Sequence, residues 1–389
     1  MSFSLCPLDP WLAKLSGQSS AGLDIGALHH WQMERLRRTV RRAAEKSPHY
    51  RESFAQLPPD LHQAVLRGEF PRNFEDMALL PFSSAEDIEC DWRRFLCVSL
   101  DAVARMVTLR TSGTVTGKEG KRFAFTEDDL GRTADFFAVG MAVLLRPGER
   151  VLILLPGADR PFGVADLLIR SLPFLGEGIN LDPGLPLEQR LELPPHRLSF
   201  GALGFAGNPL AEEKGFLEEL ERIRPQSVVA APSQLARLLC SSAVRDVGLR
   251  TLLASSEALS PDLRQKLEET WACEVFDHYG LTESAYGCAV ECRSHDGMHI
   301  READIFLECV DVVSGRPVPP GQKGEIVLTT LTREAMPLVR YRTGDYAAIL
   351  PGPCRCGSPL RRLERVQGRI VRGPDGIHVV NPQKGGNRA

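Results

Sequence analysis

The sequence has 389 residues, of which 43% are hydrophobic and 25% are charged, an ordinary composition for a globular protein with room for two to three domains of about 150 residues each. Its 47 basic and 50 acidic residues give a net charge of −3, so no overall positive field exists to hold nucleic acid or an anionic membrane. The N-terminal segment lacks the basic and apolar regions of a secretory signal, and the longest apolar run that we find, Phe136–Leu145, is about half of the ~20 residues that span a bilayer, so we expect a cytoplasmic protein.

The first predicted element is a basic amphipathic helix from Trp31 to about Phe54, with a break near Pro48. Its arginines could suggest RNA binding, but a solvated helix face is the usual reason for this pattern. We therefore expect a surface helix and no nucleic-acid partner.

From residue 127 onward, helical patterns alternate with short apolar strands. The expected helices are Glu127–Leu145, Val164–Leu175, Ala211–Ile223, one beginning at Pro232, and Pro261–Trp271. The expected strands are Arg150–Leu155, Ser227–Ala231, Leu249–Ala254 and Cys273–Phe276. This alternation predicts an α/β fold with mostly parallel sheets covered by helices.

After about residue 297 the helical patterns stop. The strand-like runs that follow are Ile305–Val313, Glu325–Thr330 and Tyr346–Leu350. Glycine and proline turns separate them, which indicates an antiparallel β subdomain. We expect an α/β core over residues 1–296, a β-rich subdomain over residues 297–382 and a disordered tail over residues 383–389.

A loop rich in hydroxyl groups, glycines and lysines, TSGTVTGKEGK, spans residues 111–121. Its backbone N–H groups could face an anion, and its lysines add positive charge. The spacing is neither that of a Walker A loop nor that of a dinucleotide-binding loop, so a flexible surface turn is the alternative.

A second polar segment, DHYGLTE over residues 277–283, directly follows a predicted strand. The carboxyl end of a parallel strand is where α/β sheets place their ligands. Tyr279 offers a ring on which a base can stack, Thr282 a hydroxyl for phosphate, and Glu283 a carboxylate for a Mg²⁺–phosphate unit. The alternative is a polar loop with a half-buried tyrosine.

A third segment, LVRYRTGD over residues 338–345, ends on Asp345, which we expect at a turn. A carboxylate there can accept hydrogen bonds from both hydroxyls of a ribose. Taken in this order, the three segments resemble the adenylate-forming superfamily and, more closely, its phenylacetate–CoA ligase branch. LLASSEALS and RRLERVQGR resemble the family's adenine-pocket and hinge segments, and the resemblance covers about residues 30–382.

The resemblance implies the fold of the large N-terminal part of an adenylate-forming enzyme, with the antiparallel β subdomain after it. It also implies ATP-dependent activation of a carboxylic acid, with aryl acids as the branch suggests, to an acyl-adenylate and pyrophosphate. Coenzyme A is the family's usual acceptor. The alternatives are an adenylating protein that passes its acyl group to a protein thiol or carrier, and a non-catalytic nucleotide-binding homologue.

The resemblance also implies which residues form the site. Those expected to hold the ATP phosphates are Ser112, Gly113, Thr114, Thr116, Gly117 and Lys121. Those expected around adenine are Glu257, Asp277, His278 and Tyr279. Thr282 would contact the α-phosphate, Glu283 would hold Mg²⁺, and Asp345 with Arg369 would bind the ribose. Phe136, Phe137 and Phe162 are candidates for the wall of an acid pocket, and ordinary core packing explains them equally well.

The sequence departs from the family pattern in three places. The phosphate loop carries two extra residues, which leaves open the lysine that reaches phosphate. Ile370 to Arg372 stand where the branch has acidic residues after the hinge arginine. The sequence ends at Ala389, before the family's mobile C-terminal lid. We therefore expect slow turnover by this chain alone, with a protein partner as one source of a closing surface and a homodimer left open.

Ten cysteines without a secretory signal predict reduced thiols. Cys354 and Cys356 form a tight pair in PGPCRCGSP, and Cys292 with His299 could complete a tetrahedral structural Zn²⁺ site. His295 or Cys288 could replace either of the latter two, and metal-free loop cysteines are the alternative.

Overall fold

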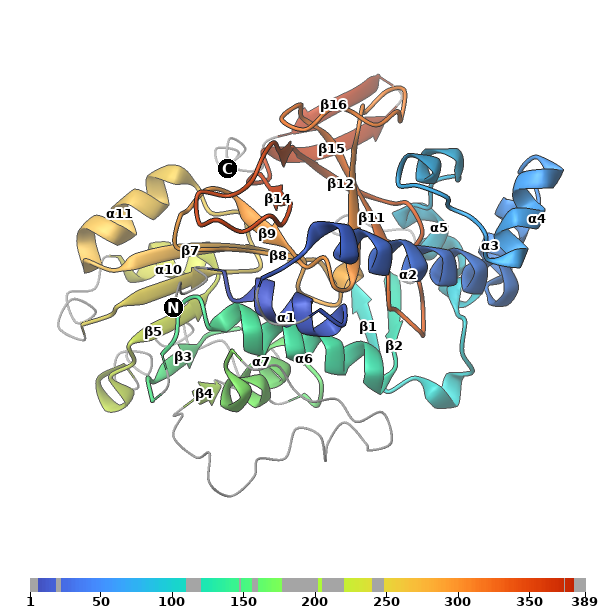
Figure 1. The fold of residues 1–389 in the computed structure, drawn as a ribbon. Coiled ribbons are helices and arrows are strands. Elements are labelled where there is room, and N and C mark those ends of the chain that lie inside the picture. The colour runs from blue at the N-terminus through green and yellow to red at the C-terminus, as the bar shows by residue number, and fades with distance from the viewer. Residues whose placement is uncertain are drawn as a thin grey trace.

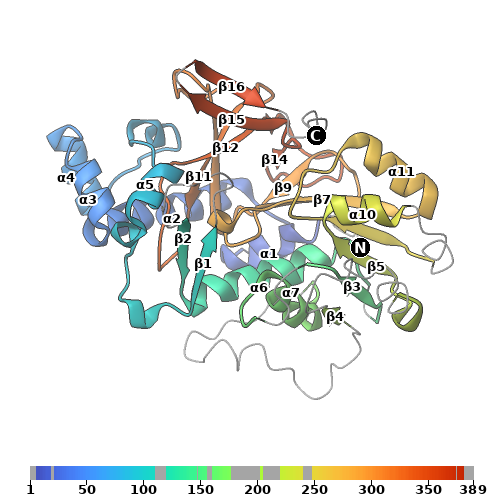
Figure 2. The ribbon, with the colours of Figure 1, turned by 180° about the vertical axis from the view of Figure 1, so that it is seen from behind.

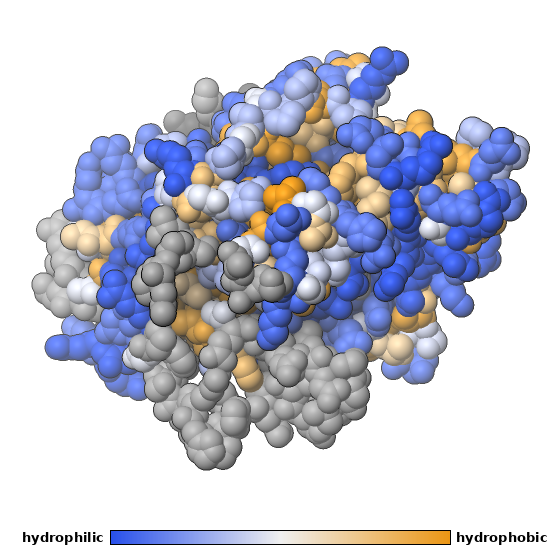
Figure 3. All heavy atoms as spheres, viewed as in Figure 1, coloured by the Kyte–Doolittle hydropathy of each residue, from blue (hydrophilic) through white to orange (hydrophobic). Residues whose placement is uncertain are grey.

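The structure is a computed structural model that describes residues 6–18, 22–109, 120–146, 148–155, 160–176, 202–204, 220–239, 248–373 and 375–380. Within these ranges, no helix has both the length and the apolar composition needed to cross a membrane. Among the coloured residues on the face shown in Figure 3, hydrophilic ones predominate.

The N-terminal part of the chain is helical (Figure 1). Its α-helices are α1 (Leu8–Leu15), α2 (Ile25–Lys46), α3 (Pro48–Phe54), α4 (Pro59–Arg67) and α5 (Ala85–Asp91). The predicted break at Pro48 is confirmed, because Ser47 ends α2 and its side chain caps α3 by accepting a hydrogen bond from the Tyr50 N–H. Helix α2 begins six residues before Trp31, where the Asp24 carboxylate accepts from the Ala27 N–H.

A nine-stranded sheet forms the centre of the molecule (Figures 1 and 2), with strand order β13-β14-β9-β8-β7-β6-β5-β3-β4. Its bounds are β3 (Val151–Ile153), β4 (Ala202–Gly204), β5 (Ser227–Ala230), β6 (Thr251–Ala254), β7 (Glu274–Tyr279), β8 (Ala289–Glu291), β9 (Met298–Ile300), β13 (Ile349–Leu350) and β14 (Arg362–Leu363). The strands from β4 to β7 are parallel, and those from β7 to β13 are antiparallel.

Helices cover both faces of the parallel strands. One core takes in Val229 and Leu253 together with α6 (Glu127–Met141) and α7 (Val164–Ser171). The adjacent residues Val228, Leu252 and Val275 face a second core. That core includes α10 (Pro232–Leu238) and α11 (Pro261–Trp271). Continuous apolar strands of this kind are expected where a sheet is buried on both sides, so the α/β prediction is confirmed.

Two antiparallel sheets complete the fold. The smaller pairs β1 (Arg105–Leu109) with β2 (Lys121–Phe125). The larger has the order β10-β11-β12-β15-β16, formed by Ile305–Val310, Gly324–Thr330, Tyr341–Ala347, Gly368–Gly373 and Gly376–Val380. Strands β9, β13 and β14 also follow residue 297, yet they pair with the nine-stranded sheet, so this part of the chain divides between two sheets.

Some predicted elements differ from the observed ones. Helix α6 ends at Met141 and not at Leu145. The turns that follow contain hydrogen bonds that span three residues and not four, such as Val143 N–H to Gly140 O. The prediction of one strand over Tyr346–Leu350 is wrong. Tyr346 belongs to β12, and after Ala348 the chain enters β13 in the other sheet. The expected helix Ala211–Ile223 lies mostly outside the described residues.

Candidate functional site

A cleft of about 320 Å³ opens at the carboxyl ends of β6 and β7. One wall comes from the residues that follow β6, including Glu257, and from Asp277, His278 and Tyr279 at the end of β7. The opposite wall comes from the five-stranded sheet, through Asp345 of β12 and Arg369 of β15. The cleft therefore brings together segments as far apart in the sequence as Glu257 and Arg369, which are more than a hundred residues apart.

The Asp345 carboxylate joins the two walls. One oxygen accepts a hydrogen bond from the Tyr279 hydroxyl at 2.6 Å, and the other pairs with the Arg369 guanidinium. Register explains the second contact, because Asp345 and Arg369 are direct cross-strand partners of β12 and β15. Asp345 lies within a strand and not at the expected turn, and its N–H donates to the Thr343 Oγ1. Burial and the Asp345 charge raise the pKa of Tyr279, so the phenol stays protonated.

Glu283 lies in a short 3₁₀ turn, Thr282–Ser284, beside the cleft-lining residues Gly280 and Leu281. Its Oε1 accepts from the Lys121 Nζ at 3.1 Å and from the Tyr341 hydroxyl at 3.0 Å. The Arg333 guanidinium holds the backbone carbonyl of Glu283 at 3.2 Å. The carboxylate is therefore fixed by a cation and a neutral donor, with Thr282 next to it in the chain.

Tyr341 and Arg333 were not predicted as site residues. Strand β12 alternates between half-buried and buried positions, so Tyr341, Thr343 and Asp345 share one buried face. That alternation was available in the sequence once LVRYRTGD was assigned to a strand. Nothing local to Arg333 indicates its contact with Glu283.

Five of the predicted phosphate-binding residues cannot be placed. Ser112, Gly113, Thr114, Thr116 and Gly117 lie outside the described residues. Lys121, the last residue of that motif, begins β2 and directs its ammonium group to Glu283.

The remaining predicted adenine-side residues differ in their surroundings. The Glu257 carboxylate accepts from the backbone N–H and the hydroxyl of Ser233 at the start of α10. Burial and the charge of Glu291 raise the pKa of Asp277 to about 7. Burial lowers the pKa of His278 to about 4, so its ring is neutral near pH 7.

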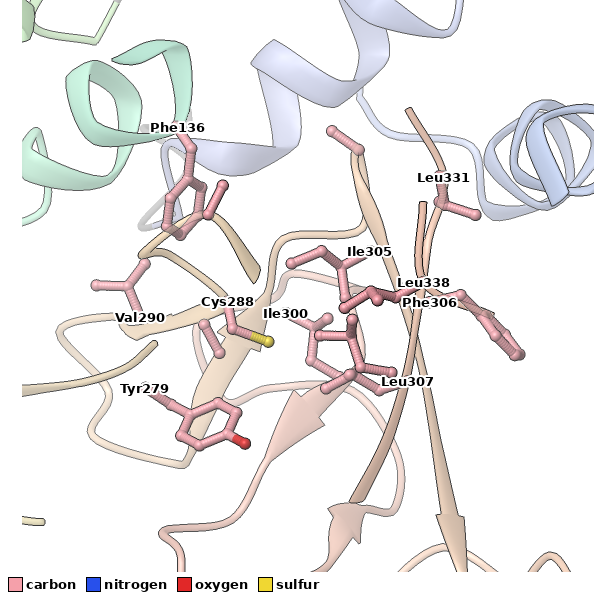
Figure 4. Close-up of a cluster of buried hydrophobic side chains, with 14 of the residues drawn as sticks. Phe136, Tyr279, Cys288, Val290, Ile300, Ile305, Phe306, Leu307, Leu331 and Leu338 are labelled. Atoms are coloured by element: carbon pink, nitrogen blue, oxygen red, sulfur yellow. The ribbon is translucent and has the colours of Figure 1, made fainter. Parts of the chain in front are cut away.

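An apolar cavity adjoins the cleft, with His278 lining both. The space open to the centre of a water molecule is about 30 Å³, more than a single water requires. Its lining residues include Phe136, Phe137 and Gly140 of α6 together with Val290. Figure 4 shows Phe136 extending from α6 toward Val290.

Two polar side chains, Ser255 and His278, line this cavity. The Ser255 hydroxyl lies 3.4 Å from the His278 Nδ1, and the His278 Nε2 has no hydrogen-bond partner among the described residues. Phe162, a predicted wall residue, is not part of this lining. Its φ of 58° is left-handed, its N–H donates to the Asp166 carboxylate, and its ring lies under the Arg170 guanidinium.

A cluster of three thiols and one imidazole lies at the antiparallel edge of the nine-stranded sheet. Cys292 directly follows β8, His299 lies in β9, and Cys354 and Cys356 lie between β13 and β14. Their ligand atoms all lie within 4.8 Å of one another. The two alternative ligands, His295 and Cys288, are not part of this cluster. His295 instead contacts the carboxylates of Glu274 and Glu291.

The spacing within this Cys–His cluster fits a tetrahedral metal. The Cys292 and Cys354 sulfurs are 3.7 Å apart, and the Cys356 sulfur is 3.5 Å from the His299 Nε2. Bonds of about 2.3 Å for Zn–S and about 2.05 Å for Zn–N would give tetrahedral separations of about 3.8 Å and about 3.5 Å. Backbone N–H groups of Ser294, Cys356 and Ser358 also point to the three sulfurs.

The chain is similar to several known proteins. Residues 198–331 match the family of AMP-binding enzymes. Phenylacetate-coenzyme A ligase of Pseudomonas putida is 29% identical over 378 residues, covering 93% of this chain and 75% of that protein. The Escherichia coli (strain K12) protein of the same name is 26% identical over 92% of this chain and 76% of its own length.

A solved structure has the same fold. The crystal structure of 2-hydroxyisobutyryl-CoA ligase in complex with 2-HIB-AMP and CoA matches with a TM-score of 0.69 and 21% identity, covering 89% of this chain and 69% of that one. The ordered motifs, the cleft between the two sheets and these likenesses agree with one another. These likenesses indicate an AMP-forming, acid–CoA ligase-like enzyme that resembles the phenylacetate–CoA ligase branch of the adenylate-forming superfamily.

Proposed function

We propose that this chain activates a carboxylic acid with ATP. A carboxylate oxygen attacks the α-phosphorus, the bond to the β-phosphate bridging oxygen breaks, and pyrophosphate leaves with that electron pair. The observation that carries the proposal is the junction of a polar cleft and an apolar cavity at His278. An acyl-adenylate has a polar nucleotide half and an acyl half, and this junction offers each half its own surroundings.

The nucleotide half would lie in the cleft. The ribose hydroxyls would donate to Asp345, with Arg369 beside it. Adenine would lie among Glu257, Asp277, His278 and Tyr279, with the Tyr279 ring as its stacking surface. The phosphates would reach toward the segment of Ser112, Gly113, Thr114, Thr116 and Gly117, whose backbone N–H groups suit an anion.

Glu283 is the residue that we propose for Mg²⁺. A magnesium ion bound there supplies charge neutralisation to the leaving pyrophosphate. Lys121 already pairs with Glu283 and would turn its ammonium group to phosphate when the nucleotide binds. Thr282 would donate a hydrogen bond to the α-phosphate. Because Glu283 is already fixed by its hydrogen bonds, adenylyl transfer would require less reorganisation of the site.

The acyl half would be uncharged and largely apolar. Phe136, Phe137 and Val290 line the cavity, and the neutral His278 and Ser255 supply no net charge to it. A second carboxylate or an ammonium group on the acid would lose its hydration without a partner. Aryl acids satisfy these conditions, and coenzyme A is the acceptor that we propose for the second step.

A structural metal completes the proposal. Three cysteines and one histidine in tetrahedral spacing suit Zn²⁺ better than harder ions. The four ligands would be Cys292, His299, Cys354 and Cys356, none of which lines the cleft.

Pyrophosphate exchange into ATP tests the proposal. Purified protein is incubated with ATP, magnesium and labelled pyrophosphate, with phenylacetate, benzoate, succinate or no acid. We expect exchange with an aryl acid and background exchange with succinate or without acid. Added coenzyme A should then give the aryl thioester, detected by mass spectrometry. Pyrophosphate exchange that proceeds without an acid would contradict acid activation. So would the absence of exchange with every acid tested.

A further inference from the structure

We infer that a metal ion in the Cys–His cluster fastens the N-terminal helix α1 to the sheet, so that occupancy of the metal site controls whether α1 stays docked. The inference extends the Zn²⁺ site proposed above and is independent of the adenylation reaction. It depends on a chain of contacts that begins at a ligand sulfur and ends in the first turn of α1.

Ser358 connects the metal site with α1. Its backbone N–H points to the Cys356 sulfur at 3.4 Å, and its hydroxyl donates to the Asp9 carboxylate at 2.6 Å. Ser358 is only 1% exposed, so its side of both contacts is shielded from water. The Cys6 thiol also hydrogen-bonds Asp9. The position of Asp9 therefore depends on where the Cys354–Ser358 segment lies.

The segment between β13 and β14 has little regular structure of its own. Cys354 and Gly357 close a tight turn through the bonds Cys354 N–H to Ser358 O and Gly357 N–H to Cys354 O. Arg362 gathers the backbone carbonyls of residues 351–353 on one side of that turn. On the other side lie the thiols, and thiol groups are weak hydrogen-bonding partners. Metal–sulfur bonds would replace these weak contacts with strong ones and fix the turn.

Helix α1 in turn needs external support. It has eight residues, its N-cap Pro7 provides no side-chain hydrogen bond, and a helix of this length is unstable alone in water. Leu8 and Leu12 are each 1% exposed and join the main core. Figures 1 and 2 both show α1 between α2 and α6. Apolar packing supplies part of its stability, and the Asp9–Ser358 bond is a polar link that positions its first turn.

The consequence is a local equilibrium with two arrangements. With metal bound, Ser358 is held and Asp9 is paired. Without metal, the turn is released, and the half-buried Asp9 carboxylate loses the stronger of its two side-chain donors and keeps only the Cys6 thiol. Burial of a carboxylate with too few hydrogen-bond donors is costly, so α1 would open more often while the sheet remains folded.

Hydrogen exchange followed by mass spectrometry tests this link, together with the zinc content by elemental analysis. Four proteins are compared: the unaltered chain, the double variant Cys354→Ser/Cys356→Ser, the variant Ser358→Ala, and the control Cys90→Ser, which removes an exposed cysteine outside the cluster. Peptides from α1 report the link, and peptides from β5 and β6 report the global fold.

We expect about one zinc per chain in the unaltered protein and the control, and none in the double variant. The double variant should exchange α1 amides about tenfold faster, with β5 and β6 unchanged. Ser358→Ala should retain zinc and still exchange α1 faster, which separates the link from the metal site. If the double variant does not fold, removal of zinc from the unaltered chain with a chelator gives the same comparison.

Two results would overturn the inference. One is a protein that neither contains zinc nor binds it when it is added. The other is unchanged α1 exchange after zinc removal or in Ser358→Ala. Neither readout depends on ATP, acid or turnover, so failure here is distinguishable from failure of the proposed acid activation.

Discussion

Glu283 is held in place by contacts within the chain itself. Lys121 and Tyr341 both donate to its Oε1, and the side chain is only 7% exposed. Tyr341 is also buried, and the nearby Glu283 charge helps burial keep its pKa above the ordinary range of tyrosine. The phenol therefore acts as a neutral positioning donor and not as an acid.

Tyr341→Phe should lower the rate of pyrophosphate exchange about tenfold at limiting magnesium, because the carboxylate loses a donor worth about 1–2 kcal/mol. At saturating magnesium the loss should be smaller, since the ion itself can order the carboxylate. Tyr346→Phe on the same strand serves as the control. Equal rates for Tyr341→Phe and the unaltered chain at every magnesium concentration would remove this role.

Asp345→Ala should weaken ATP binding by about ten- to a hundredfold, because the ribose loses its acceptor and Arg369 its partner. Asp345→Asn keeps an oxygen that can accept from the Tyr279 hydroxyl, so it should weaken ATP binding less than Asp345→Ala does. Calorimetric titration with ATP measures both. Unchanged affinity in the alanine variant would refute the assignment of the ribose to this carboxylate.

Titration of Asp277 should lower the free energy of unfolding as the pH rises. Its pKa is raised to about 7 by burial and Glu291, whereas an unfolded aspartate titrates near ~3.9. The folded state therefore binds more protons between these values, and the contribution of Asp277 to the free energy of unfolding falls as pH rises from 4 to 7.

Asp277→Asn removes this dependence while keeping the shape of the side chain. Its melting temperature should rise relative to the unaltered chain at pH 8, and the difference should shrink or reverse at pH 5. Thermal unfolding of both proteins across this range measures the effect. A difference that does not change with pH would show that Asp277 is ionised over the whole range.

The sequence indicated individual functional residues better than it indicated the contacts between them. Tyr279, Asp345 and Arg369 were each expected at a nucleotide, and all three lie in one cleft. Tyr341 was missed because Asp345 was assigned to a turn, which hid the shared face of β12. The Asp9–Ser358 contact joins positions 349 residues apart, and no local pattern encodes it.

At the scale of elements, capping residues and apolar periodicity predicted the α/β part well. Helix α11 has the predicted bounds because Ser260 caps it and Pro261 opens it. Strand β7 was expected to end at Phe276, but it continues through the polar residues to Tyr279, where β8 pairs with it. Pairing of this kind comes from tertiary contacts, which override the apolar pattern of a single strand.

Helix α6 offers a direct test of the acid cavity. A Cβ added at Gly140 would lie 3.7 Å from the nearest side-chain atom, Cγ1 of Val290, an ordinary contact. Gly140→Leu should therefore fold, aided by a gain in helix propensity, while its longer side chain fills the cavity. Aryl-acid exchange should fall at least about tenfold, while exchange with acetate or propionate is retained or increased.

Gly140→Ala is the matched control, because a single methyl group leaves most of the cavity open. The ratio of kcat/KM values for phenylacetate and propionate is the informative quantity in each protein. An equal loss for both acids in Gly140→Leu would place the acid elsewhere.

The whole molecule shows why the domain arrangement was harder to predict than the fold class. Strands β9, β13 and β14 extend the parallel sheet with antiparallel edges, while β10 to β12, β15 and β16 form a separate sheet. A sequence predicts that a segment is a strand, but the choice of sheet depends on long-range pairing. The cleft exists because the two sheets meet at Tyr279 and Asp345.

The central claim is that an acid oxygen attacks the α-phosphorus of ATP at this junction. The most direct measurement uses an aryl acid labelled with oxygen-18 in its carboxylate, with ATP, magnesium and coenzyme A, followed by mass spectrometry of the nucleotide products. Attack at the α-phosphorus predicts AMP that carries one labelled oxygen, because the bridging oxygen stays with phosphorus when the thiol attacks the acyl carbon. Unlabelled AMP, or label that appears in orthophosphate instead, would contradict the account.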